Sequence, residues 1–465
     1  MVRLILLCPL ALLLCICTSA AASSAARPPA PLRTAIVARD IPTAPAALDE
    51  WLNRAELTGA SVIKLPVFWN TVSPKRPAAG ASDPDNPDYR FATLDIQLQR
   101  IAAHGFTPLL LVSGAPGWAR QAPDNGKTPL GFDLPAWTSF TKALASRYDG
   151  HHQLPKVKLW QAWNEPNGSR DLSPAFEHAK PVSPLLYRRI VETMADSVHG
   201  VSSQNTLVAG GLSPFGRPGS VISPLRFMRQ LFCLDTASAR PVDCRRPLPV
   251  DVWAVHPYTS GGPFHSAYHP NDVSLGDLPE VRALLTQAVE AGSLEKGRLP
   301  LWVTEFAWDS APADPGGVPL ERHARWTAAA LYQMHLSGVE LVAWFSLHDD
   351  PVRVSSYQSG LFNALWKPKP ALRSFFFPLY VSASDGSLTI WGRTPHGKAG
   401  PVAVERRVGS RWQKVVVLRA SSNGIFGSQL RAAGGTMRAR AGVEISNSFS
   451  SAKVRDVPVR PFGSR

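Results

Sequence analysis

The chain has 465 residues, of which 45% are hydrophobic and 18% charged, and its formal net charge is +14. This length exceeds that of a usual single domain, so we expect one large domain and a smaller one. The apolar content is ordinary for a soluble globular protein, and no segment after the first 22 residues is long and apolar enough to span a membrane.

The first 22 residues have the pattern of a secretory signal peptide. A short positive start ends at Arg3, residues 4–17 form an apolar core, and residues 20–22 are alanines of a small-residue cleavage pattern. The apolar core is shorter than the roughly 20 residues that a membrane span needs. We therefore predict a secreted, extracellular protein, in which residues 23–31, rich in Ala, Ser and Pro, form a flexible leader.

From residue 32 to about residue 347, short apolar runs alternate with amphipathic helical stretches. The eight runs are TAIVA (34–38), SVIKLPVF (61–68), TPLLLV (107–112), VKLWQA (157–162), TLVAG (206–210), DVWAVH (251–256), PLWVTE (300–305) and ELVAWFS (340–346). Strands that are apolar on both faces and separated by helices indicate a parallel sheet covered by helices. The pattern predicts an α/β fold, a (β/α)8 TIM barrel over residues 32–380. The alternative, a doubly wound open sheet, usually has a Gly-rich phosphate loop after its first strand, and this sequence has none.

Residues 381–465 have a different sequence pattern: short segments in which apolar and polar residues alternate are separated by Gly and Ser. This pattern is typical of a small antiparallel β-sandwich. From Asp385 to the end there are 14 Lys or Arg and four acids, a net charge of +10, which leaves the larger domain close to balanced. The basic domain either holds the protein near an anionic cell-wall polymer or is a solvated strand face kept soluble by Arg.

Only two of the five cysteines, Cys233 and Cys244, lie outside the predicted signal peptide. Two cysteines in an exported chain suggest one disulfide, and the alternative is a pair of buried free thiols. No Cys or His pair has the spacing of a metal site, so we expect no metal and no cofactor.

Two glutamates stand in matching contexts, Glu165 after the fourth apolar run and Glu305 at the end of the seventh. In a (β/α)8 barrel the residues that do chemistry lie at the carboxyl ends of the strands. That rule sets aside Glu340 and Asp251, which come at the beginnings of predicted strands. Two carboxylates that converge on one bond from different strands are the groups that hydrolyse glycosides.

The motif WNEPN at residues 163–167, together with TEF at 304–306, resembles glycoside hydrolase clan A, the retaining (β/α)8 glycosidases, closest in texture to families five and thirty-nine. VFW, GAPGWA, VHPY and AWFS match the clan's pattern in the same order along the chain, so the resemblance covers the whole barrel. It implies that Glu165 is the general acid and base and that Glu305 is the nucleophile, with the two carboxyl groups roughly 5 to 5.5 Å apart. In many relatives an Arg stands on the second strand where this chain has Lys64, so an anchoring role there does not carry over directly.

Further residues are expected to contact the substrate. The resemblance implies that Asn164 binds the sugar 2-hydroxyl, and His256 and Tyr258 are placed to orient the nucleophile, although a strand-end His is as often structural. Trp344 is predicted to stack under the reactive sugar, because aromatic faces suit the C–H face of a pyranose. Candidates for further contacts, each of which could instead belong to the core or the rim, are Trp69, Asn70, Trp118 and Trp308.

These observations predict a secreted retaining β-glycosidase that hydrolyses O-glycosidic bonds of a polysaccharide or oligosaccharide through a covalent glycosyl-enzyme intermediate. We expect a carbohydrate as its partner and no nucleic acid. Two alternatives stay open at this point: a carbohydrate-binding pseudoenzyme, and a transglycosylase that uses the same two glutamates.

Overall fold

The computed structural model describes residues 31–120, 133–234, 244, 246–295, 297–351 and 357–459. The predicted signal peptide and almost all of the predicted leader lie outside these residues. None of the helices in the described ranges is both long and apolar enough to cross a membrane.

The predicted barrel is confirmed: eight parallel strands close in the order β1-β10-β9-β8-β7-β4-β3-β2. The strands are β1 (Arg33–Val37), β2 (Val62–Phe68), β3 (Thr107–Ser113), β4 (Leu159–Ala162), β7 (Thr206–Leu212), β8 (Val252–Val255), β9 (Leu301–Phe306) and β10 (Val339–Trp344). Each coincides with one of the eight apolar runs. The barrel closes where β1 pairs with β10, with Ile36 opposite Trp344. All eight carboxyl ends therefore meet at one end of the barrel, where the chemistry of such folds takes place.

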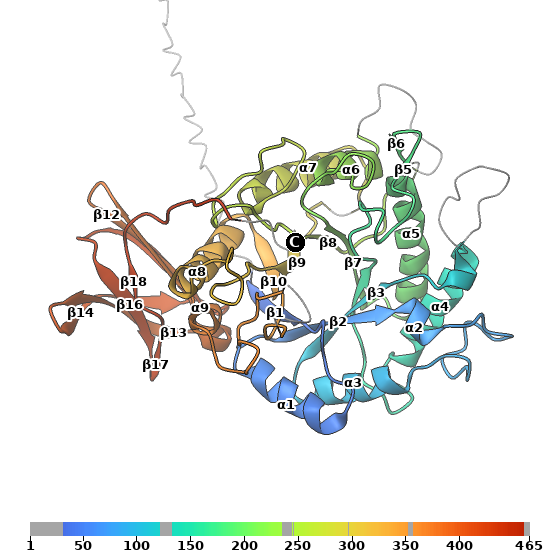
Figure 1. The fold of residues 1–465 in the computed structure, drawn as a ribbon, viewed down its shortest axis with the longest axis horizontal. Helices are drawn as coiled ribbons and strands as arrows, with labels where there is room; N and C mark the ends of the chain where they lie inside the picture. The colour runs from blue at the N-terminus through green and yellow to red at the C-terminus, as the bar shows by residue number, and fades with distance from the viewer. Residues whose placement is uncertain are drawn as a thin grey trace, which may run out of the picture.

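Helices surround the barrel (Figure 1). They are α1 (Pro45–Glu56), α2 (Trp69–Val72), α3 (Ala92–Ala103), α4 (Leu134–Arg147), α5 (Ser183–Val201), α6 (Pro224–Leu231), α7 (Leu278–Glu290), α8 (Leu320–Leu336) and α9 (Pro370–Phe376), with short 3-10 turns η1 (Gly117–Ala119), η3 (Leu275–Asp277) and η4 (Pro395–Gly397). In α5 the buried Tyr187, Ile190, Val191 and Met194 recur at helical spacing and form one apolar face. The Asp133 side chain caps α4 by accepting from the Ala136 amide at 3.0 Å. Within the loop after β4, β5 (Phe176–Glu177) and β6 (Lys180–Pro181) form a small hairpin.

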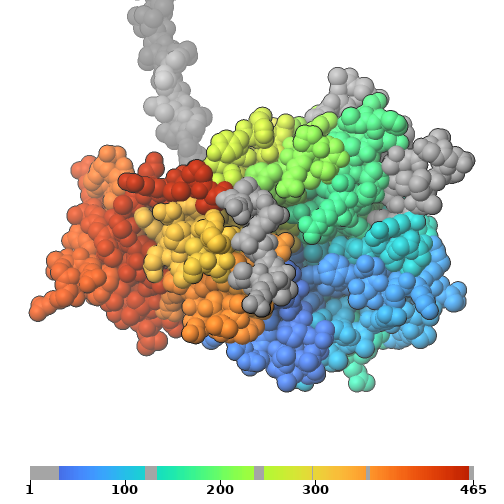
Figure 2. Space-filling view, viewed as in Figure 1, coloured from blue at the N-terminus to red at the C-terminus, as the bar shows by residue number. Residues whose placement is uncertain are grey.

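The C-terminal part consists of two antiparallel sheets, as expected for a small sandwich. One contains β11 (Leu379–Ser384), β12 (Ser387–Arg393) and β15 (Ile425–Arg431), and the other contains β13 (Gly400–Val408), β14 (Arg411–Ala420), β16 (Thr436–Ala441), β17 (Glu444–Ile445) and β18 (Phe449–Ser450). Their shared core includes Val381, Ile390, Val404 and Met437, and it also takes in Ala324 of α8. The sheets stand beside the barrel, in orange and red in Figure 2.

Two further contacts tie distant segments together. The predicted disulfide is present between Cys233 and Cys244, whose Cα atoms lie 6.3 Å apart. After β18 the chain returns to the barrel, where the Val459 amide donates to the Ser260 carbonyl at 2.8 Å. Asp456 binds the same loop through the amide of Gly262 and through His265 Nδ1 at 2.7 Å. The last described residues therefore support the loop that follows β8.

Candidate active site

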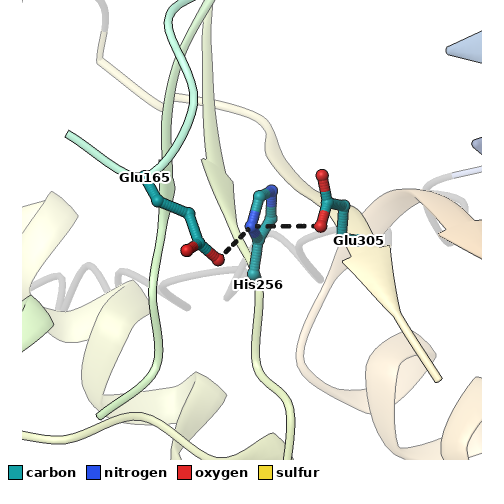
Figure 3. A group of neighbouring side chains, drawn as sticks. All are labelled: Glu165, His256 and Glu305. Atoms are coloured by element: carbon teal, nitrogen blue, oxygen red, sulfur yellow. Dashed lines mark hydrogen bonds and ion pairs between the residues drawn. The ribbon is translucent and has the colours of Figure 1, made fainter. Parts of the chain in front are cut away.

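The two glutamates singled out in the sequence meet at the carboxyl ends of β4 and β9. One carboxylate oxygen of Glu165, one of Glu305 and a ring nitrogen of His256 all lie within 4.8 Å of one another. Figure 3 shows His256, which follows β8, between the two carboxyl groups. The strand order explains this convergence, because β4 and β9 are separated in the barrel only by β7 and β8.

The backbone that presents Glu165 is held in an uncommon conformation. Trp163 and Glu165 have φ values of 64° and 38°, in the left-handed region that side chains other than glycine rarely adopt. Such residues each cost about 1–3 kcal/mol and persist only where the surroundings fix them. The Glu165 amide donates to the Gly211 carbonyl at 3.1 Å. The buried Asn167 donates to the carbonyls of Ser213 and Ile222, both at 2.9 Å. The final Asn of the WNEPN motif thus anchors the loop that aims Glu165 at the cleft.

The negative charge of Glu305 is stabilised by a cation and by a hydrogen-bond donor. The ammonium of Lys64, which is completely buried on β2, lies 2.8 Å from Glu305 Oε1. The hydroxyl of Tyr258 donates to Glu305 Oε2 at 3.2 Å. Burial by itself raises the pKa of Glu305, but the charges of His256 and Lys64 and the hydrogen bonds from Lys64 and Tyr258 outweigh it, so this pKa is lowered from the ordinary 4.5. Glu305 is therefore ionised at neutral pH.

His256 connects the two carboxyl groups. Its Nδ1 lies 3.1 Å from Glu165 Oε1 and 3.7 Å from Glu305 Oε2, and its Nε2 lies 3.1 Å from Thr304 Oγ1. With a proton on Nδ1, the ring donates to Glu165, while Nε2 pairs with the Thr304 hydroxyl. The ring is buried and fixed at both nitrogens. His256 thus sets the relative position of the two carboxyl groups.

Glu165 has a polar neighbour that the sequence did not single out. Asn164 Nδ2 donates to Asp171 Oδ1 at 3.3 Å, and the indole of Trp163 donates to the Asp171 carbonyl at 2.9 Å. Burial and the nearby charge of Glu165 raise the pKa of Asp171 to about 6. The buried Oδ1 of Asn164 has no hydrogen-bond partner among the described residues. An acceptor in that state, beside two carboxyl groups, suits a hydroxyl group of a bound ligand.

Three of the tryptophans considered as substrate contacts lie in the core. Trp344 is only 1% exposed, its indole donates to the Ser359 carbonyl at 2.8 Å, and its ring packs on Phe375 of α9 and His323 of α8. Trp69 and Trp308 are buried as well, the first against Trp137 and Phe140 of α4 and the second against Trp326 of α8. The prediction that Trp344 stacks under the sugar is wrong, because its ring points outward into the helix layer and has no free face for a sugar. For Trp69 and Trp308 the alternative of a core position holds.

The two remaining candidates lie in the segments that follow β2 and β3. Trp118 is partly exposed, and its indole donates to the Ser73 carbonyl at 2.9 Å while the guanidinium of Arg76 covers its ring. The backbone amide of the exposed Asn70 donates to the Gly114 carbonyl, just after β3, at 2.8 Å. Both are rim residues.

Successive residues of an extended chain point to opposite sides, so the residue after Trp344 faces inward. This residue is Phe345, whose ring lies 5.3 Å from that of Tyr357. Tyr357 interacts electrostatically with both Glu165 and Glu305, which places the aromatic pair on the side of the carboxyl groups. Arg39, after β1, lies over both rings and forms an ion pair with Asp350.

Sequence reasoning missed Asp171 and Phe345 as parts of the site, and it left the anchoring role of Lys64 in doubt. For Lys64 a signal was available: a charged residue within the apolar run SVIKLPVF must find a buried partner. A cavity of about 280 Å³ adjoins the site, lined among others by Phe68, Trp163, Arg170 and Asp171. It gives a ligand room beside Glu165.

Among the described residues, Glu165, His256 and Glu305 also form a group with the donor atoms of a metal site. The Lys64 ammonium at 2.8 Å already neutralises Glu305 and would repel a divalent cation. The charge distribution therefore suits two carboxyl groups in unequal environments better than a metal centre.

No protein-family model matches the chain, and no curated protein matches its sequence. Solved structures resemble it in fold. A family 39 glycoside hydrolase from the gut symbiont Bacteroides cellulosilyticus has a TM-score of 0.55 and 14% sequence identity, and the match covers 87% of this chain and 81% of that chain. A GH39 enzyme from Xanthomonas axonopodis pv. citri has a TM-score of 0.51 and 14% identity, and the match covers 87% of this chain and 93% of that chain. At such identities the likeness establishes the fold, and this fold occurs in one of the two families whose motifs the sequence resembles.

Proposed function

We propose that the protein is a secreted retaining β-glycosidase, with Glu305 as the nucleophile and Glu165 as the general acid and base. The observation that carries the proposal is the short separation of the two carboxyl groups, whose nearest oxygens lie within 4.8 Å. Retaining enzymes hold their carboxyl groups about 5 to 5.5 Å apart, whereas inverting enzymes need about 6.5 to 9.5 Å to admit a water molecule.

The unequal surroundings support the assignment of roles. A nucleophile must be ionised before it attacks, and Lys64 and Tyr258 stabilise the carboxylate of Glu305. Within the part of the chain that the structure describes, Glu165 forms no ion pair with a Lys or Arg, and its side chain is 25% exposed, against 12% for Glu305. Glu165 can therefore exchange its proton with a leaving group and with water, as an acid and base must.

In the first step, Glu165 protonates the leaving oxygen while a carboxylate oxygen of Glu305 bonds to the anomeric carbon. In the second step, Glu165 removes a proton from water, which displaces Glu305 and restores both groups. Asn164 accepts a hydrogen bond from the sugar 2-hydroxyl through its Oδ1. His256 and Tyr258 hold the carboxylate of Glu305 in position to attack the anomeric carbon. The signal-peptide pattern and the Cys233–Cys244 disulfide support secretion.

The test uses Glu165→Gln and Glu305→Gln on a panel of aryl β-glycosides that differ in leaving group. We expect Glu305→Gln to abolish turnover of every substrate. Glu165→Gln should retain the first step only with a leaving group that needs no proton, such as dinitrophenolate. Glu340→Gln is the matched control, because Glu340 lies at the start of β10 beside Arg298, at the opposite end of the barrel.

Loss of less than tenfold in both site variants would refute the assignment. NMR of the first-formed product should show the β-anomer, and an α-anomer would rule out the retaining mechanism. If the wild type binds polysaccharide but cleaves no glycoside, the protein is a binding pseudoenzyme. If added sugar acceptors outcompete water, it is a transglycosylase.

A further inference from the structure

The sheet formed by β13, β14 and β16 has one face in the C-terminal core and one face toward solvent. Val402, Val404, Met437 and Ala439 are buried on the inner face. Because successive side chains of a strand alternate between faces, their neighbours along the strands point outward. β14 stands at the end of the molecule remote from the barrel, at the left of Figure 1.

The strand register identifies the side chains of this outer face. Arg407 lies opposite Trp412, Glu405 lies opposite both Lys414 and Arg438, Ala403 lies opposite Arg440, and Pro401 lies opposite Arg419. The outer face therefore carries five basic side chains and one acidic one, a net charge of +4 over three strands.

The single acid does not balance these cations. Glu405 accepts from Arg438 at 2.7 Å and from Arg440 at 3.4 Å, so both guanidinium groups share one carboxylate. The remaining three basic residues, Arg407, Lys414 and Arg419, are exposed. Like charges on neighbouring strands destabilise a sheet, and solubility requires only a mixed surface. This excess of one sign therefore points to an anionic ligand.

An aromatic side chain lies among these cations. Trp412 is partly exposed, and the guanidinium of Arg438 lies 4.2 Å from the centre of its ring. Trp412 and Lys414 are two positions apart on β14 and so project from the same face. A sheet face that presents an indole among cations suits a linear chain of sugar rings that bear negative groups.

We propose that the outer face of β13, β14 and β16 binds a linear anionic polysaccharide. Arg407, Lys414 and Arg419 neutralise its carboxylate or sulfate groups, and Trp412 packs on a sugar ring. The binding is separate from the carboxyl pair of the barrel. The choice of a polysaccharide over another polyanion rests on the proposed glycosidase function.

The test measures binding of the full-length protein to polygalacturonate, dextran sulfate, neutral dextran and single-stranded DNA, by affinity electrophoresis and calorimetry at 50 and 200 mM NaCl. We expect binding to one or both anionic polysaccharides, at least tenfold weaker in the higher salt, and no binding to neutral dextran. The two anionic probes distinguish carboxylate from sulfate recognition.

The triple variant Arg407→Gln, Lys414→Gln, Arg419→Gln should bind at least tenfold more weakly, and Trp412→Ala should also weaken binding. The matched control replaces three exposed barrel lysines, Lys142, Lys156 and Lys158, by Gln, which removes the same charge from elsewhere. Circular dichroism and thermal melts check that each variant is folded.

Equal weakening by the control triple variant, or unchanged binding in the triple variant of the sheet, would overturn the proposal. Binding of DNA as tight as that of the polysaccharides, through the same residues, would also overturn it. Turnover of a small aryl glycoside should be unaffected by the sheet variants. If the glycosidase proposal fails, the polysaccharide-binding measurements can still be interpreted, because binding does not require cleavage.

Discussion

The ion pair between Lys64 and Glu305 gives the sharpest test of the site. Lys64→Met keeps an unbranched side chain of similar length in β2 but removes the charge that lies 2.8 Å from Glu305 Oε1. At this distance, and with an effective dielectric constant of about 20, two unit charges attract by about 6 kcal/mol. His256 and Tyr258 remain in contact with Glu305, so we expect a net loss of about 3 kcal/mol, at the lower end for a broken buried pair.

For catalysis, a loss of about 3 kcal/mol corresponds to more than 100-fold in kcat/KM. The acidic limb of the pH profile should move to higher pH, because the nucleophile becomes harder to ionise. Stability gives a second readout that needs no substrate. The lowered pKa of Glu305 contributes stability that is present above about pH 4.5 and is lost as the pH falls through its folded-state pKa. The difference in Tm between wild type and variant should therefore be large at pH 7 and shrink below about pH 4.5.

Lys369→Met is the matched control. Lys369 is also buried and lies 2.5 Å from the carboxylate of Asp349, but neither residue contacts the carboxyl pair. This variant should lose stability without a shift of the acidic limb. The reasoning fails if folded Lys64→Met retains kcat/KM within tenfold of the wild type with an unchanged acidic limb.

Three further predictions concern other parts of the chain. Asp171→Asn should move the basic limb of the kcat/KM profile to lower pH. Above the Asp171 pKa of about 6, the negative charge of Asp171 opposes loss of the proton from the general acid Glu165, and the variant lacks this charge. A basic limb at the same pH in the variant would contradict this. Trp344→Ala should cost about 3–5 kcal/mol in urea unfolding without changing KM, whereas Phe345→Ala, which removes a ring that is also buried, should raise KM about tenfold in addition to lowering stability. A raised KM in Trp344→Ala together with an unchanged KM in Phe345→Ala would restore Trp344 as the stacking residue. Replacing Cys233 and Cys244 by Ser should lower the free energy of unfolding by about 3 kcal/mol, since the disulfide closes a loop with a sequence separation of 11. Reduction of the wild type with dithiothreitol should produce the same loss.

The barrel could be predicted from the sequence because its signals are local. A fully buried parallel strand is apolar at every position, so the runs such as TPLLLV and PLWVTE mark their strands without knowledge of the neighbours. The end-of-strand rule then requires only the direction of each strand. This information is enough to select Glu165 and Glu305 and to set aside Glu340, which lies at the other end of the barrel next to Arg298.

The surroundings of the pair could not be predicted in the same way. Lys64 and Glu305 are 241 positions apart, and only the closure of the barrel brings them into contact. The wrong prediction for Trp344 is a matter of a single position, because the last residue of β10 points outward while Phe345 points inward.

The sequence by itself determined the barrel, the small C-terminal sandwich and the two glutamates at one end of the strands, because these follow from residue type and short-range periodicity. Only the tertiary structure decided how the glutamates differ, through Lys64 and Tyr258 beside one and Asp171 near the other. The physical reason is that a carboxyl group's ionisation depends on charges and burial within a few ångströms, and those neighbours come from strands far apart in the chain.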